Sequence, residues 1–213
     1  MSTFVLVHGA WGGAWIWRRV TGPLRAAGHA VHAVTLTGDG ERAHLRRPDI
    51  SLQTHIDDVV GLVEAEELDD IVLVGHSYGG MVITGAADAL PGRIRQLVYV
   101  DAMVPLPGEG WGAGHPPEIV AARLAAAKAN DNALPPPDPA GFGLDPSDVE
   151  WLRRRHVPHP FGMYRVPLHF DGERLVRLPR TFIDCTEPAY PTIAAMRTRV
   201  RQTPGFRVVE MKT

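Results

Sequence analysis

The sequence predicts an α/β fold in which helices flank a mostly parallel sheet. In the first hundred residues, short apolar runs alternate with segments of helical periodicity, which is typical of βαβ units. Residues 4–7 are apolar at every position, as a strand covered by helices on both faces requires. A tight glycine-rich turn at residues 75–79 follows a third apolar run. The 213 residues suit a single domain, 1–213, with a substantial core.

The apolar pattern locates the individual elements. Helical spacing begins after the first apolar run and again after Ser51, which is a plausible N-cap. We expect strands at residues 4–7, 30–36, 71–74, 97–100, 181–185 and 206–211, and helices at 17–27, 52–63, 78–90 and 193–200. The intervening segment is rich in Pro, Gly and Ala and carries helical patterns near residues 117–129 and 147–155. We therefore expect a lid, inserted at about residues 105–178.

Composition excludes several functional classes. Hydrophobic residues make up 45% and charged residues 22%, and the net charge is −2, so charge gives no reason to expect binding to nucleic acid or to a membrane. No apolar run approaches the roughly 20 residues that span a bilayer. The first residues contain neither a basic region nor a small-residue cleavage site, so we expect no signal peptide. The only cysteine, Cys185, excludes an intrachain disulfide. We expect a soluble cytoplasmic protein.

The glycine-rich turn Gly75-His76-Ser77-Tyr78-Gly79 matches G-x-S-x-G. A buried strand precedes it and a helix follows it, which is the context of a nucleophile elbow. In such a turn the serine adopts a strained backbone and projects its Oγ above the sheet, while the glycines avoid collisions with neighbouring elements. A phosphate-binding loop is the disfavoured alternative, because the turn has neither the G-x-x-x-x-G-K-[ST] pattern nor the spaced glycines of a dinucleotide-binding fingerprint. Ser77 is the predicted nucleophile.

A second loop, His8-Gly9-Ala10, ends the first strand. Strand ends of this kind lie beside the elbow, where open α/β sheets collect their ligands. An oxyanion hole there combines the N–H of the residue after the serine with an N–H from this loop. We therefore predict that Tyr78 and Ala10 are the backbone donors. His8 lies on the oxyanion side, which favours a structural hydrogen-bonding role.

These motifs together resemble one group of the α/β hydrolases. The group contains the plant salicylate-binding esterase, methyl ketone synthase and hydroxynitrile lyases, and the similarity is closer to its bacterial members, including pyrethroid-type carboxylesterases. The similar segments are residues 4–11, 13–17, 36–44, 54–60, 73–82 and 97–102. The resemblance implies an α/β-hydrolase fold, no metal or cofactor, and a homodimer as a common assembly. Lyases of the group carry threonine in place of Gly9 and an acidic residue in place of His76, so this chain resembles the hydrolytic branch.

The resemblance also implies where the triad acid and base should lie. The acid follows the penultimate strand, where Glu187 is the nearest carboxylate, and Asp101 at the end of an earlier strand is the alternative. The base is a histidine after the last strand, but no histidine follows His169 in the sequence. We therefore expect the catalytic histidine beyond Thr213, with loss of the base and a pure binding function as the alternative.

The lid supplies candidates for the rest of the pocket. Its aromatic and apolar side chains do not follow the periodicity of the sheet, and ligand pockets are mostly apolar. We expect four of them to bind substrate: Trp111, Phe161, Met163 and Tyr164. His156 and His159 form a weak metal pair because a proline separates them and no third ligand is evident, so a lid-lining or surface role is expected.

The sequence as a whole predicts a serine carboxylesterase. Its substrate should be a small or medium hydrophobic ester, cleaved through an acyl-enzyme. The alternatives are a non-catalytic small-molecule binding protein on a hydrolase scaffold and a lyase of the same group.

Overall fold

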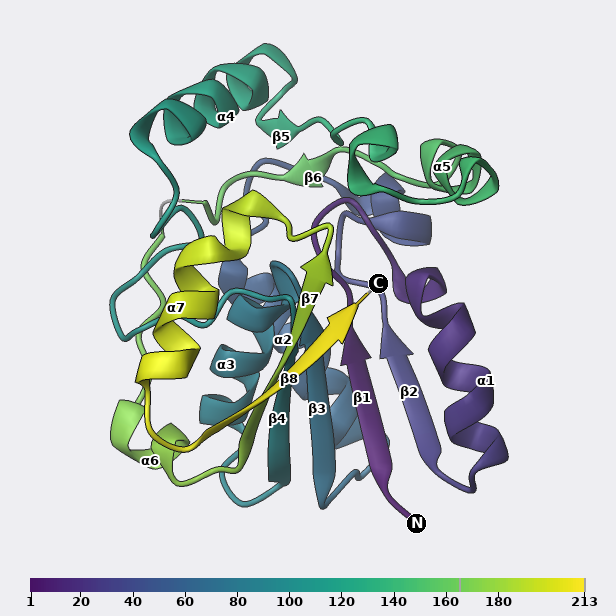
Figure 1. Cartoon of the computed structure of the whole chain (residues 1–213), viewed down its shortest axis with the longest axis vertical. Coiled ribbons are helices and arrows are strands. Elements are labelled where there is room, and N and C mark those ends of the chain that lie inside the picture. The colour runs from purple at the N-terminus through teal and green to yellow at the C-terminus, as the bar shows by residue number, and fades with distance from the viewer. Residues whose placement is uncertain (165, 213) are drawn as a thin grey trace.

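The protein is built around a six-stranded, fully parallel sheet (Figure 1). The computed structural model describes residues 1–164 and 166–212. The strands are β1 (Thr3–Val7), β2 (Ala30–Val34), β3 (Ile71–His76), β4 (Ile94–Val100), β7 (Arg180–Glu187) and β8 (Phe206–Lys212), in the order β2-β1-β3-β4-β7-β8. The predicted parallel sheet is thereby confirmed, and each predicted strand overlaps an observed one. Because all strands run the same way, their carboxyl ends share one edge.

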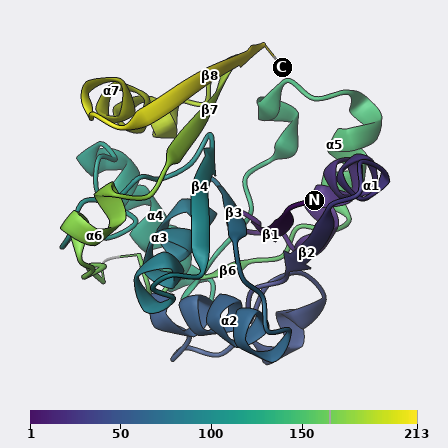
Figure 2. The same cartoon turned by 90° about the horizontal axis from the view of Figure 1, so that it is seen from below.

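Helices cover both faces of this sheet (Figure 2). The principal helices are α1 (Arg18–Ala26), α2 (Leu52–Ala65), α3 (Gly79–Ala89) and α7 (Ala194–Gln202). Side chains of α2, α3 and α7 share one large apolar core, and the region around α1 packs with the other face in a smaller one. Ser51 caps α2 and exchanges hydrogen bonds with Thr54, which confirms the predicted N-cap. No helix in residues 1–164 or 166–212 has the length and apolar character to cross a membrane.

The segment between β4 and β7 contains α4 (Pro117–Ala129), β5 (Ala133–Leu134), α5 (Pro146–Arg153), β6 (His159–Pro160) and α6 (Gly172–Val176). Most of this segment, from α4 to β6, lies over the carboxyl edge of the sheet, and only its last helix, α6, lies at the opposite edge (Figure 1). Strands β5 and β6 pair in a small antiparallel sheet. Trp11, in the loop after β1, holds this segment by donating its indole N–H to the carbonyl of Leu134 (2.9 Å) and by accepting from the N–H of Val157 (3.2 Å). The expected lid is therefore tied to the first strand.

A buried polar cluster joins β6 to the sheet. The Nδ1–H of His159 donates to the carboxyl group of Asp39 (2.8 Å), and both side chains are fully buried. This corrects the surface role expected for His159. His55 lies beside it, donating from Nε2 to the carbonyl of Thr37 (2.9 Å) and accepting at Nδ1 from the hydroxyl of Tyr78 (2.9 Å). His55 must stay neutral to keep its bond with Tyr78, because a protonated imidazole has no lone pair to accept from the hydroxyl.

The elbow itself depends on close backbone packing at three glycines. A Cβ at Gly75 would lie 2.6 Å from the carbonyl oxygen of Gly79, and one at Gly79 would lie 2.7 Å from the carbonyl oxygen of His8. A Cβ at Gly80 would collide with the carbonyl oxygen of Met103. Helix α3 therefore enters between the β1 and β4 loops with no room for side chains, as its sequence of glycines predicts.

Gly80→Ala should destabilise the fold by about 3 kcal/mol or more, because backbone rather than a flexible side chain must move. Gly61→Ala is the matched control: Gly61 lies on the exposed face of α2 with open space around it, and alanine there should stabilise by about 0.5–1 kcal/mol. Urea unfolding of both variants measures the difference. Equal effects at the two positions would contradict the packing described for the elbow.

The buried cluster predicts that acid weakens the fold. Burial lowers the pKa of His8 and His55 to about 4 and that of His159 to about 3, and burial raises the pKa of Asp39 to about 7. Between about pH 6.5 and 4 the unfolded chain gains three imidazole protons that the folded chain does not. Asp39 has the opposite effect on stability, because between these pH values its carboxyl group is ionised in the unfolded chain and protonated in the folded chain. The three histidines outweigh the single aspartate, so the free energy of unfolding should decrease as the pH is lowered.

For these four groups the net difference is about two protons, which corresponds to a fall on the order of 2–3 kcal/mol per pH unit. The free energy of urea unfolding at a series of pH values measures it. Asp39→Asn, which keeps an acceptor for His159, should make the fall steeper because it removes the opposing group. A stability that is flat or rises on acidification would be inconsistent with neutral, buried imidazoles.

Candidate active site

Ser77 has the strained backbone that the elbow motif predicts. Its φ of 50° lies in the left-handed region, which serine rarely adopts. Hydrogen bonds hold it there: its N–H donates to the carbonyl of Val100 (3.2 Å), and its carbonyl accepts from Gly80 (3.1 Å) and Met103 (3.0 Å). The end of β4 and the start of α3 therefore fix the serine between them. Its Oγ forms no hydrogen bond with any other described residue.

Two backbone N–H groups beside the serine also lack acceptors. Within the described part of the chain, neither Ala10 nor Tyr78 donates its backbone N–H to any group, although both residues are buried. Buried backbone donors are almost always paired, so two unpaired donors next to the predicted nucleophile are a feature that needs an explanation. They are the two donors predicted for the oxyanion hole.

The orientation of His8 is settled by its hydrogen bonds. Its Nε2 accepts from the backbone N–H of Leu36 (3.0 Å), so Nδ1 carries the proton and donates to the carbonyl of Gly9 (2.6 Å). Both ring nitrogens are thus engaged in fixing the loop after β1. His8 supports the Ala10 loop and is not oriented as a base for Ser77.

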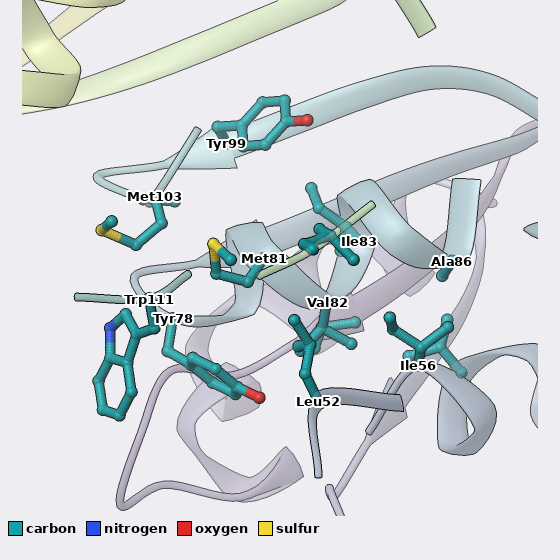
Figure 3. Close-up of a cluster of buried hydrophobic side chains, with 14 of the residues drawn as sticks. Leu52, Ile56, Tyr78, Met81, Val82, Ile83, Ala86, Tyr99, Met103 and Trp111 are labelled. Atoms are coloured by element: carbon teal, nitrogen blue, oxygen red, sulfur yellow. The ribbon is translucent and has the colours of Figure 1, made fainter. Parts of the chain in front are cut away.

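A pocket opens at Ser77 on the carboxyl edge of the sheet. The residues that line it are Trp11, Ser77, Met103, Trp111, His115, Arg123, Tyr190, Thr192 and Ile193. They come from the loops after β1, β3, β4 and β7 and from the lid. Figure 3 shows Trp111 beside Tyr78, and the two rings lie 4.9 Å apart. The elbow therefore opens into a pocket lined by both apolar and polar side chains.

The four predicted lid residues take different positions. Trp111 lines the pocket directly. Tyr164 lies behind Trp111, with ring centroids 5.1 Å apart, and Phe161 stacks on Tyr164 at 4.5 Å. Met163 is fully buried in the same apolar core. A direct contact between substrate and Phe161, Met163 or Tyr164 stays a prediction.

Sequence reasoning missed two polar residues of the pocket, His115 and Arg123. Both come from the lid, where no strand or helix pattern indicates which side chains face Ser77. Burial and the neighbouring Arg123 lower the pKa of His115 to about 4, so its imidazole is neutral at physiological pH. The available signal was a histidine and an arginine eight residues apart in an otherwise Ala- and Pro-rich stretch, which does not identify a pocket.

The two candidate acids have contrasting surroundings. Glu187, at the end of β7, is 62% exposed and pairs with Lys212 (3.1 Å). Asp101, directly after β4, is buried and accepts from Arg197 (2.6 Å). Burial raises the pKa of Asp101, and Arg197 opposes that shift. Both carboxylates lie at the edge that carries Ser77, and the choice between them stays a prediction.

The general base also stays a prediction. In the described part of the chain, no histidine forms a hydrogen bond with Ser77. His115 is the histidine that shares the pocket with Ser77, but a pKa of about 4 makes it a weak base at neutral pH. Strand β8 ends at the same edge of the sheet as the strand that leads into Ser77.

Comparison with known proteins identifies the family. Residues 4–212 match the model of the Alpha/beta hydrolase family. A "Carbendazim hydrolyzing esterase" from Nocardioides sp. (strain SG-4G) is 48% identical over 181 residues, which cover 81% of this chain and 75% of that protein. An "Alpha-hydroxynitrile lyase" from Arabidopsis thaliana is 40% identical over 106 residues, which cover 48% and 40% of the two chains.

The fold matches solved structures over its whole length. An extracellular alpha/beta-hydrolase from a Paenibacillus species, described as sharing structural and functional homology with tobacco salicylic acid binding protein 2, superposes with a TM-score of 0.89. The two sequences are 25% identical, and the match covers 100% of this chain and 90% of the other. On the family match, the esterase relative and this fold, the chain belongs to the alpha/beta hydrolase family.

Proposed function

We propose that this chain is a serine carboxylesterase that cleaves small or medium ester substrates through an acyl-enzyme. The observation that carries the proposal is the arrangement at the elbow. Ser77 stands in a strained turn with a free hydroxyl, and the unpaired N–H groups of Ala10 and Tyr78 lie in the adjoining loops. Such donors stabilise the negative charge that develops on a carbonyl oxygen under attack. Strain that persists in a folded protein is typical of a functional position.

The mechanism follows from these parts. Ser77 Oγ attacks the ester carbonyl while a histidine base takes its proton, and the oxyanion receives hydrogen bonds from Ala10 and Tyr78. Collapse of the tetrahedral intermediate releases the alcohol, which takes up the proton from the histidine. Water then attacks the acyl-serine in the same way. A carboxylate, Glu187 or alternatively Asp101, orients the histidine.

The lack of space for a side chain at Gly9 favours the hydrolytic reaction over the lyase alternative. A Cβ there would lie 2.9 Å from the Cβ of Ser77 and 3.0 Å from Nδ1 of His76. The threonine that lyases of the resembling group carry at this place would therefore force the loop or the serine to move. The name of the Nocardioides relative supports an ester-cleaving enzyme as well. Its carbendazim substrate is a starting point for substrate tests here.

Ser77→Ala should abolish hydrolysis of p-nitrophenyl esters, by a factor on the order of 10⁶ for loss of a triad nucleophile. A fluorophosphonate probe should label the native chain at Ser77 and leave the variant unlabelled. Ser147→Ala is the matched control because Ser147 is exposed on α5, and its labelling and activity should be unchanged. Labelling at another serine would contradict the assignment of Ser77, and no labelling in the native chain would favour the binding-protein alternative.

The triad acid can be assigned by comparing two isosteric variants, Glu187→Gln and Asp101→Asn. We expect Glu187→Gln to lower kcat by about 10⁴, as loss of a triad carboxylate does. Asp101→Asn should weaken the contact with Arg197 and affect stability more than kcat. The reverse pattern, with native urea stability in both variants, would assign the role to Asp101.

A further inference from the structure

One end of the Ser77 pocket is polar and carries a positive charge. Arg123 of α4 and His115, just before α4, both line the pocket. The guanidinium of Arg123 lies 5.5 Å from the ring centre of Trp111 and 5.8 Å from that of Tyr164. Two aromatic rings therefore hold the cation in place at the wall opposite the sheet.

The groups at this end are hydrogen-bond donors. Nδ1 of His115 accepts from the hydroxyl of Tyr164 (2.8 Å) and from Nη1 of Arg123 (3.4 Å), because an arginine can only donate. The proton of the neutral His115 ring is therefore on Nε2, and that N–H has no acceptor among the described residues. His115 and Arg123, which both line the pocket, thus keep N–H donors that no described residue uses.

Arg123 has no carboxylate partner within residues 1–164 and 166–212. Other partly buried arginines of this edge are paired: Arg199 with Glu109, and Arg197 with Asp101 and Asp184. The guanidinium of Arg123 thus lies beside two aromatic rings and has N–H donors that no described carboxylate accepts from. It can therefore form an ion pair with an anion that enters the pocket. A planar carboxylate matches the guanidinium fork in charge and in geometry.

We propose that the pocket selects esters that also carry a carboxylate, with the carboxylate bound by Arg123 and the N–H of His115 while Ser77 attacks the ester carbonyl. The substrate class is that of monoesters of dicarboxylic acids and related acidic esters. This specificity rests on the proposed esterase function, since it names which esters the site takes.

Binding can be measured without catalysis in the Ser77→Ala variant. Trp11 and Trp111 line the pocket, so tryptophan fluorescence reports occupancy. The probes are monomethyl succinate, glutarate and adipate, with methyl hexanoate as a neutral comparison. At least one acidic ester should bind about tenfold or more tightly than the neutral one, the gain of one charge-assisted contact. Adding Arg123→Met should remove that advantage and leave methyl hexanoate within about twofold.

Lys128→Met is the matched control, because it removes the same charge from an exposed position of the same helix. It should leave the preference for acidic esters intact. Arg123→Lys should retain part of the preference, since it keeps the charge and loses the fork. A role of Arg123 in aromatic packing alone predicts a different result: Arg123→Met would weaken neutral and acidic probes alike.

In the chain with Ser77 intact, the ratio of kcat/KM for acidic over neutral p-nitrophenyl esters should fall about tenfold in Arg123→Met. The inference is overturned if no preference for acidic esters appears in binding to the Ser77→Ala variant or in hydrolysis by the native chain. It is also overturned if Lys128→Met removes the preference as fully as Arg123→Met does. Ser77-dependent cleavage of neutral esters without that preference would leave the esterase function standing and refute only the specificity. Failure of the esterase function would instead appear as absent labelling at Ser77.

Discussion

The tight crossing of β3 into α3 is the constraint on which the site depends. The strained conformation of Ser77 is held by hydrogen bonds to Val100 and Met103 and exists because α3 starts against neighbouring backbone at Gly79 and Gly80. Each contact is between main-chain atoms, so it sets positions to within a few tenths of an ångström. The same packing brings the loop after β1, with Ala10, next to the serine. Nucleophile and proposed oxyanion donors are therefore positioned by one piece of backbone geometry.

The pocket above this turn is assembled by the lid. Trp11 links the loop after β1 to Leu134 and Val157, and the buried Asp39–His159 pair ties β6 to the loop after β2. His55 extends that contact to the hydroxyl of Tyr78, whose backbone N–H belongs to the proposed oxyanion hole. The fold thus couples the seating of the lid to the elbow through neutral, buried imidazoles. Catalytic geometry and stability depend here on the same polar cluster.

Much of the fold could be predicted because its signals are local. Strands β1 and β3 are apolar at nearly every position, α2 has a serine N-cap, and the elbow glycines have no alternative residue that fits. The lid could be located by its change in composition and by the pattern of α4. These features depend on neighbours in sequence, which a periodicity captures.

The contents of the pocket could not be predicted as well, because they depend on contacts between distant segments. His115 and Arg123 line the same pocket as Ser77 because the lid folds over the sheet. His159 forms a hydrogen bond with Asp39, which lies 120 residues away in the sequence. A periodic pattern carries no information about such pairs. Trp111, one of the four aromatic and apolar lid residues singled out from the sequence, lines the pocket. Phe161 and Tyr164 carried the same signal and lie behind it, supporting the wall.

The central claim is that Ser77 and the N–H groups of Ala10 and Tyr78 form one unit for acyl transfer. A crystal structure of the chain after reaction with a phosphonate ester tests it most directly, because the tetrahedral phosphorus mimics the intermediate. The account predicts phosphorus bonded to Ser77 Oγ, with one phosphonyl oxygen about 2.7–3.1 Å from both backbone nitrogens. An adduct whose oxygens all turn away from Ala10 and Tyr78, or phosphorus on a residue other than Ser77, would contradict it.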